Sequence, residues 1–210
     1  MINKLTLIED DFLEKICKES INDLNVFYEI NWTEYLPRII VVDSRKTIDS
    51  LKGKKTESWL IGWSEGKTIY VLDRNSFEKE SDHAYDPATY SAFIKHELSH
   101  SFYNVVSGGQ QKPIWLNEGV AIYTSGQNNF KKVPAAFNKF LEFYDRGGKD
   151  VYGEAGFFVQ TLVEKFGKQK LLDLIKESKN LKTKEEFENF FVKEYGFSLD
   201  YKEINEKKLI

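Results

Sequence analysis

The residues on either side of His96 constrain the fold of this chain more than any other segment. Apolar residues recur there at intervals of three and four, which is typical of a helix with one buried face. They are Phe93, Ile94, Leu98, Phe102, Val105 and Val106. We therefore predict a helix over 87–106 that packs in the core and stops before Gly108-Gly109. His96, Glu97 and His100 lie in its middle turns, and a buried helix retains such groups only where they have a partner.

The spacing of the two histidines points to a metal site. His96 and His100 are one helical turn apart, so on a helix they lie about 40° apart and face one target. Two neutral imidazoles in this arrangement are suitable ligands for Zn²⁺, and a catalytic zinc also needs a third protein ligand and an open position. Glu118 is the candidate third ligand. Glu97, roughly 100° from His96 on a helix, can reach a water at the metal and act as a general base.

A pattern this short also occurs on solvated helices that have no function. Two features argue against that interpretation. The chain has 3 histidines, and two of them lie in the pattern. Glu118 then falls on a second helix, which Pro113 opens at a first-turn position. The sequence therefore predicts one Zn²⁺ per chain, bound by His96, His100 and Glu118.

Composition limits the classes of partner. With 30 basic and 33 acidic residues, the net charge of −3 gives no electrostatic footprint for nucleic acid or an anionic membrane, so neither is expected as a partner. The N-terminus lacks a signal-peptide pattern and no apolar run reaches membrane-spanning length, so we expect a cytoplasmic protein. Cys17 is the only cysteine, which excludes an intramolecular disulfide, and it is expected to pack as a small core residue. The oligomeric state is left open.

The pattern of apolar residues predicts one α+β domain over 1–210, with a small sheet lobe at about 25–84 packed on a helical lobe at about 85–200. Buried strands are expected over 37–43, 59–63 and 67–72, with a hairpin turn at 64–66. Besides 87–106, helices are expected over 8–24, from 113 onward, and over 134–144, 153–166, 168–177 and 183–195. Trp115 is expected to anchor the core, and Gly119 to let the two metal-bearing helices approach closely. His83 lies in a polar loop, either solvated or at the rim of a cleft.

Three segments together resemble the gluzincin metallopeptidases of the peptidase MA-like family, with a more distant similarity to the aminopeptidase N family. They are His-Glu-Leu-Ser-His from His96, Trp-Leu-Asn-Glu-Gly-Val-Ala from Trp115, and Val-Tyr-Gly-Glu-Ala-Gly-Phe-Phe from Val151. The resemblance implies a thermolysin-like fold with His96, His100 and Glu118 as zinc ligands and Glu97 as the base. It also implies that the hydroxyl of Tyr152 stabilises the oxyanion of the tetrahedral intermediate. The alternative for Tyr152 is an aromatic residue that only caps a helix.

The function that the resemblance implies is zinc-dependent hydrolysis of peptide or protein substrates. The chain has no clear counterpart of the Gly-x-Met-Glu-Asn motif that binds a substrate's free amine in aminopeptidases, which favours an endopeptidase. In this family the strand nearest the metal can bind extended substrate by strand addition, and the segment 59–63 is the candidate. Two alternatives stay open. One is a catalytically silent protein that binds peptides in the same groove, and the other is a zinc hydrolase of a non-peptide bond.

Overall fold

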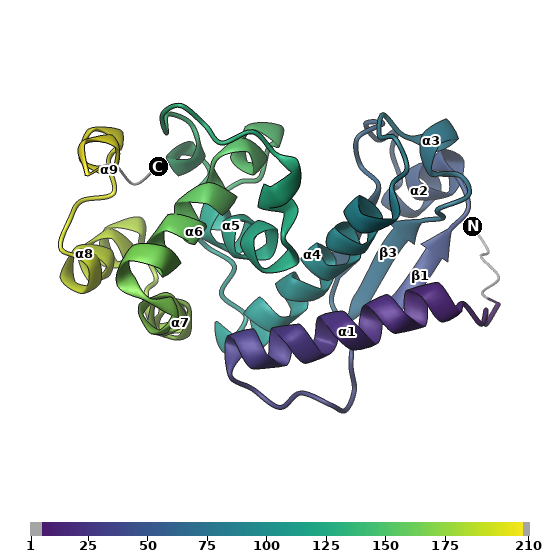
Figure 1. Ribbon diagram of the computed structural model, residues 1–210, viewed down its shortest axis with the longest axis horizontal. Helices are drawn as coiled ribbons and strands as arrows, with labels where there is room; N and C mark the ends of the chain where they lie inside the picture. The colour runs from purple at the N-terminus through teal and green to yellow at the C-terminus, as the bar shows by residue number, and fades with distance from the viewer. Residues whose placement is uncertain (1–5, 208–210) are drawn as a thin grey trace.

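The computed structural model describes residues 6–207 and is mainly helical, with one small sheet at one side of the molecule and the C-terminal helices at the other (Figure 1). Its strands are β1 (Arg38–Val42), β2 (Gly62–Glu65) and β3 (Thr68–Leu72). Its α-helices are α1 (Asp11–Tyr28), α2 (Arg45–Lys52), α3 (Phe77–Glu80), α4 (Pro87–Val106), α5 (Ile114–Ser125), α6 (Ala155–Phe166), α7 (Lys168–Glu177), α8 (Lys184–Tyr195) and α9 (Tyr201–Glu206). Short 3-10 turns are η1 (Gln127–Phe130), η2 (Phe140–Glu142), η3 (Lys149–Gly153) and η4 (Ser178–Asn180). This mixed, mainly helical architecture agrees with the predicted α+β class.

The sheet has the strand order β1-β3-β2, which makes β2 an edge strand. β1 pairs with β3 in parallel, and β2 pairs with β3 as an antiparallel hairpin. The predicted strand over 59–63 and turn at 64–66 are displaced, because Glu65 still pairs with Thr68 and only Gly66 and Lys67 form the turn. Gly66 has a φ of 60°, the left-handed conformation that a two-residue hairpin turn requires. β1 confirms the strand predicted over 37–43, although its residues are mostly half-buried rather than buried.

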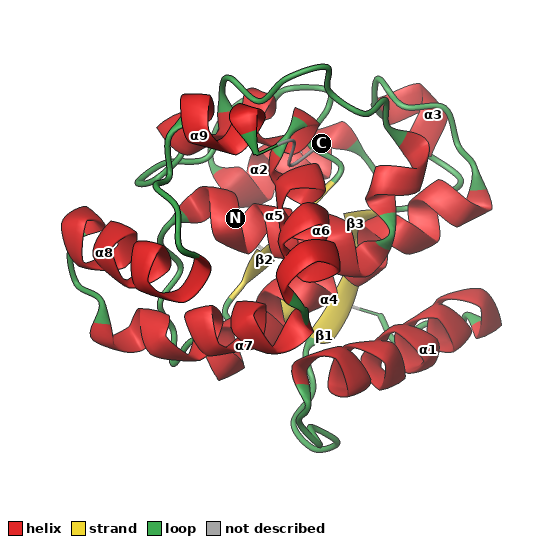
Figure 2. Cartoon of the chain, turned by 60° about the vertical axis from the view of Figure 1, so that its left-hand side comes forward, coloured by secondary structure: helices red, strands yellow, loops and turns green. Residues whose placement is uncertain are grey.

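Helix α4 lies at the centre of the molecule and contacts α1, α5 and the sheet (Figures 1 and 2). Its bounds are those predicted from the sequence. The carboxylate of Asp86 accepts hydrogen bonds from the backbone N–H groups of Ala88 and Thr89, both at 2.9 Å, and Pro87 occupies the first turn. These N-terminal signals fix where the helix begins, because they satisfy donors that have no partner within the helix.

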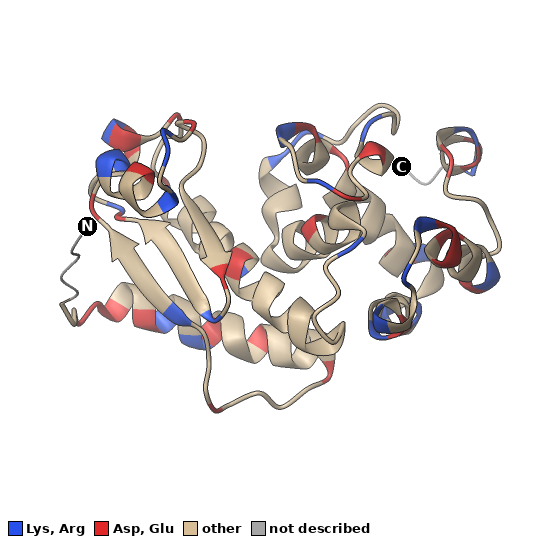
Figure 3. Cartoon of the chain, turned by 180° about the vertical axis from the view of Figure 1, so that it is seen from behind, with Lys and Arg blue, Asp and Glu red and all other residues tan. Residues whose placement is uncertain are grey.

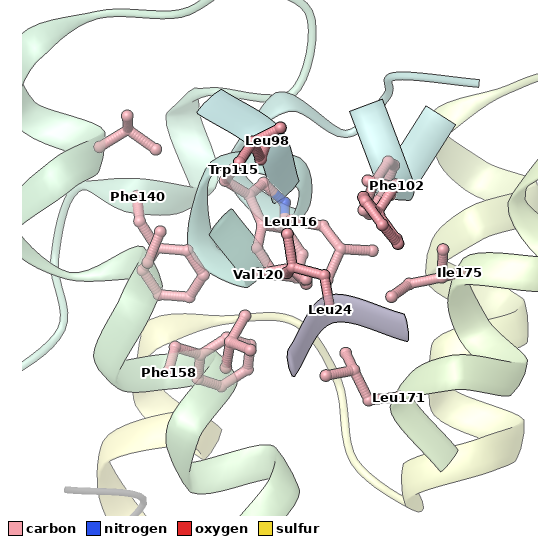
Figure 4. Close-up of a cluster of buried hydrophobic side chains, with 14 of the residues drawn as sticks. Leu24, Leu98, Phe102, Trp115, Leu116, Val120, Phe140, Phe158, Leu171 and Ile175 are labelled. Carbon is pink, nitrogen blue, oxygen red and sulfur yellow. The ribbon is translucent and has the colours of Figure 1, made fainter. Parts of the chain in front are cut away.

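The hydrophobic core is one continuous cluster of buried side chains, from Leu13 in α1 to Ile204 in α9. Figure 4 shows its central part, where side chains of helices α1, α4, α5, α6 and α7 meet. They include Leu24, Leu98, Phe102, Trp115, Leu116, Val120, Phe158, Leu171 and Ile175. Trp115 is 1% exposed and its ring contacts those of Phe140, Phe158 and Phe187, which confirms it as a core anchor. The division into a sheet lobe and a helical lobe within one domain stays a prediction.

The helix predicted over 134–144 is wrong. Only the short turn η2 forms there, because the backbone N–H groups of Asn138, Lys139 and Phe140 donate to the buried carboxylate of Glu154 at 2.9–3.2 Å. Those donors are then not available to carbonyl groups one turn earlier, as a helix requires. The acceptor lies 14 to 16 residues further along the chain, beyond any local pattern.

The bounds of other helices differ from prediction to a smaller degree. α1 begins at Asp11, after its N-cap Asp10, and continues to Tyr28 rather than ending at Leu24. α2, α3 and α9 were not predicted, since each is short and contains at most two apolar side chains. α7 and α8 have the predicted bounds, and α8 has the predicted capping box between Thr183 and Glu186. Cys17 is half-buried against the core.

Charged residues are concentrated on the outer helices, and the sheet and the central helices carry few of them (Figure 3). Within residues 6–207, no helix is both long and apolar enough to cross a membrane.

Gly119 permits a close helix approach, as predicted, but the partner differs. A Cβ atom at this position would lie 2.7 Å from the carbonyl oxygen of Ala155 and 2.8 Å from Cγ2 of Val159, both in α6. The prediction named the other metal-bearing helix, α4, as the neighbour that needs the space. Gly119, next to Glu118 in sequence, therefore sets the distance between α5 and α6.

We expect Gly119→Ala to lower the free energy of unfolding by about 1–3 kcal/mol, because the added methyl group overpacks the α5–α6 contact. Helix propensity alone would favour alanine by about 1 kcal/mol, so the sign of the measured change in the free energy of unfolding shows which effect dominates. Denaturant unfolding measures it. Gly147→Ala is the control, since its Cβ would meet only Ile114 Cγ2 at 3.9 Å. Unchanged or increased stability in Gly119→Ala would contradict the role given to this glycine.

Candidate metal centre

Two imidazoles of helix α4 face one point in space. The ring centroids of His96 and His100 lie 4.7 Å apart and their Nε2 atoms 3.1 Å apart. This confirms the expectation that histidines one turn apart share a direction. Glu97, between them in sequence, is buried with 6% of its surface exposed. The middle of α4 thus places two imidazoles and a carboxylate in or at the edge of the protein interior.

Helix α5 brings Glu118 to the same point. Its Oε2 atom lies 3.4 Å from His96 Nε2 and 3.7 Å from His100 Nε2. Tetrahedral coordination with bonds of about 2.0–2.2 Å requires ligand atoms roughly 3.3–3.6 Å apart. The three edges of the triangle, 3.1, 3.4 and 3.7 Å, fit this geometry. His96, His100 and Glu118 therefore form a group that can hold a metal ion.

The environment of these atoms also fits a cation. Glu118 Oε2 is buried and has no hydrogen-bond partner among the described residues. Burial by itself would lower the pKa of His100, but Glu118 and Glu97 outweigh it and raise the pKa above its ordinary value. For Glu118, burial raises the pKa, while His100 and His96 bring it below its ordinary value. Positive charge between these groups is therefore favoured, and a metal cation would supply it.

Asn117 orients one of the candidate ligands. Its Oδ1 atom lies 2.8 Å from His100 Nδ1, so Nδ1–H donates to the amide and leaves Nε2 free to face Glu118. A second hydrogen bond of this kind fixes both the tautomer and the ring orientation of a metal-binding histidine. This role of Asn117 was not predicted from the sequence. The only signal available was an amide next to the third ligand, and such neighbours are common.

The centre opens into a cavity of about 630 Å³. His96, Glu97 and Tyr152 line it, together with Trp59–Gly62, which leads into the edge strand β2. His83 also lines the cavity, and its Nε2 lies 3.2 Å from the carbonyl oxygen of Trp59, so it is at the rim rather than simply solvated. The segment 59–63, expected to form the edge strand itself, instead contributes its first residues to the cavity wall.

Tyr152 reaches the same cavity from the η3 turn. Its ring centroid lies 6.3 Å from that of His96. Burial raises its pKa above the ordinary value, and Glu118 and Glu97 raise it further, so the phenol keeps its proton. Glu154, two residues later, holds the 138–140 backbone as described above and fixes the segment that carries Tyr152. All five residues expected at the site are therefore near one cavity.

Comparisons with models of protein families, with curated proteins and with solved structures found no match to this chain. The function of the site is therefore inferred from its own residues and geometry.

We expect Asn117→Ala to weaken binding of a divalent metal by about 10–100-fold, because His100 loses the acceptor that fixes its ring. Isothermal titration with Zn²⁺ into the chelator-treated protein measures the affinity. Asn104→Ala is a matched control, since Asn104 lies one turn beyond His100 in α4 and its Oδ1 makes no hydrogen bond within residues 6–207. Equal affinities in Asn117→Ala and the parent protein would show that the Asn117–His100 contact does not support the site.

Proposed function

We propose that this chain is a zinc-dependent peptidase of the gluzincin type, with a thermolysin-like arrangement of its sheet and metal-bearing helices. The observation that carries the proposal is a triangle of two imidazole nitrogens and one carboxylate oxygen, with edges of 3.1–3.7 Å, beside an open cavity. Two nitrogen ligands and one carboxylate are a known donor set for catalytic zinc, which keeps a fourth position open. One Zn²⁺ per chain would bind between the three ligand atoms.

Zn²⁺ bound here would supply Lewis acidity, which lowers the pKa of a water molecule and polarises a peptide carbonyl. Glu97 accepts a proton from water as the water oxygen forms a bond to the carbonyl carbon. Burial raises the pKa of Glu97, with His100 and His96 opposing, and a raised pKa makes the carboxylate a better proton acceptor. The same proton passes to the leaving nitrogen as the C–N bond breaks.

Tyr152 stabilises the charge that develops during attack. Because its phenol stays protonated, the hydroxyl can donate a hydrogen bond to the carbonyl oxygen as that oxygen gains negative charge. A donor fixed in a largely buried position needs no reorganisation at that moment. The presence of both a base and an oxyanion donor favours an enzyme over a silent peptide-binding protein.

The cavity suits an extended peptide. β2 is an edge strand, so its outer backbone groups are available to a peptide that adds to the sheet. The segment 59–62 leads that edge into the cavity that His96 and Glu97 line. No motif for a free amine was found in the sequence, and the proposal is therefore an endopeptidase rather than an aminopeptidase.

Glu97→Gln and Tyr152→Phe test the mechanism in different ways. We expect Glu97→Gln to keep its zinc but lose hydrolysis, because an amide cannot accept the proton. Tyr152→Phe should lower turnover by about 10²–10³-fold with little change in KM, because its hydrogen bond matters only in the transition state. Digestion of an unbiased peptide library by zinc-loaded protein, followed by kinetics on a cleaved peptide, measures both.

Tyr123→Phe, a change of the same kind in α5 outside the cavity, is the control and should leave turnover unaltered. An active Glu97→Gln protein would rule out Glu97 as the base. An effect of Tyr152→Phe confined to KM would assign Tyr152 to ground-state binding instead. Absence of cleavage by the zinc-loaded parent protein would contradict the proposed function as a whole.

A further inference from the structure

Three lysines line the cavity into which the metal centre opens. Lys131 and Lys132 follow the η1 turn, and Lys149 begins η3. Across residues 6–207, no carboxylate oxygen lies within 4.0 Å of any of these ammonium groups. In contrast, Lys139 forms an ion pair with Asp150 at 3.6 Å. The three lysines therefore give the cavity wall positive charge that no carboxylate of the described residues pairs directly.

Lys131 is held in place rather than free in solvent. Its Nζ atom donates to the carbonyl oxygen of Tyr152 at 2.9 Å and lies 5.8 Å from the centre of the Tyr152 ring. Burial lowers its pKa to about 8, with Glu118 opposing. An ammonium group has three donors, and within residues 6–207 one acceptor contacts this group, which leaves two donors for a ligand. The proposed chemistry at the metal makes no use of this side chain.

The rest of the cavity wall is mainly apolar and aromatic. Trp59, Leu60, Phe77, Phe93 and Phe130 line it, and Glu97 is the only acidic residue among its lining side chains within 6–207. An apolar wall with a few charged groups binds a ligand that combines apolar surface with the complementary charge. Although the whole chain has a net charge of −3, the lysines would attract an acidic ligand to this cavity.

We propose that Lys131, Lys132 and Lys149 form a carboxylate-binding subsite, which makes acidic peptides the substrate class of this cavity. An apolar side chain of the peptide occupies the aromatic part, and a carboxylate contacts the lysines. That carboxylate belongs either to an Asp or Glu side chain or to the C-terminus of the peptide. The inference rests on the proposed function, since it takes the cavity to be the substrate cleft.

Binding is measured on zinc-loaded Glu97→Gln protein, which keeps the cleft while removing the proposed base. The probes are four pools of fluorescein-labelled heptapeptides, each with a central Phe. Two pools contain Glu in their otherwise randomised flanks, and the other two contain Gln instead. In each pair, one pool ends in a free carboxylate and the other in an amide. By fluorescence polarisation, we expect at least one carboxylate-bearing pool to bind about tenfold more tightly than the Gln pool with an amide end. The pool that gains affinity identifies the source of the carboxylate.

Substitutions test whether the lysines cause the preference. Lys132→Gln combined with Lys149→Gln, and separately Lys131→Gln, should reduce the preference to about twofold or less, because each removes donors from the carboxylate. Lys131→Arg retains the charge and should preserve the preference for carboxylate-bearing pools. If Lys131 had only a structural role, Lys131→Gln would leave the ratio of affinities between the pools unaltered. Lys139→Gln is the control, since Lys139 is paired with Asp150 and does not line the cavity.

Equal binding of all four pools, no binding of any pool, or a preference that survives both lysine substitutions would overturn the inference. Cleavage by the parent protein separates this result from the proposed function. Cleavage without a preference for acidic peptides removes the subsite and leaves the peptidase. A binding preference without cleavage supports the subsite and removes the peptidase.

Discussion

The packing of α4 against α5 is the constraint on which the rest of the structure depends. It brings two imidazoles and two carboxylates together in the protein interior, with Glu118 Oε2 only 3.4 and 3.7 Å from the histidine nitrogens. Burying carboxylates is unfavourable unless their negative charge is compensated, so positive charge between α4 and α5 stabilises this contact. A divalent cation bound between these groups would supply that charge and would couple metal binding to folding of the helix pair.

The elements around this helix pair keep its geometry fixed. Gly119 lets α6 approach the far side of α5, and Asn117 holds the ring of His100. The carboxylate of Glu154 ties the 138–140 backbone to the segment that carries Tyr152. These three contacts determine how accurately His96, His100, Glu118, Glu97 and Tyr152 are placed relative to one another.

Local sequence signals account for part of this structure. The bounds of α4, α7 and α8 were predictable because apolar periodicity agrees with clear end signals. That His96 and His100 face the same point was predictable from helix geometry. Contacts between distant segments were not predictable. The helix expected over 134–144 is absent because its donors are taken by Glu154, and the role of Asn117 depends on a partner in another helix. The lysine-lined wall likewise combines two turns separated in sequence, which no local pattern links.

X-ray absorption at the zinc edge, on protein purified without chelator, tests the central claim most directly. We expect one zinc per chain with four nitrogen or oxygen neighbours at about 2.0–2.1 Å, and with scattering from two imidazole rings. Glu118→Ala should lose one of the oxygen neighbours while both imidazoles remain. A sulfur neighbour at about 2.3 Å, a site without imidazole scattering, or no bound zinc after metal loading would contradict the account.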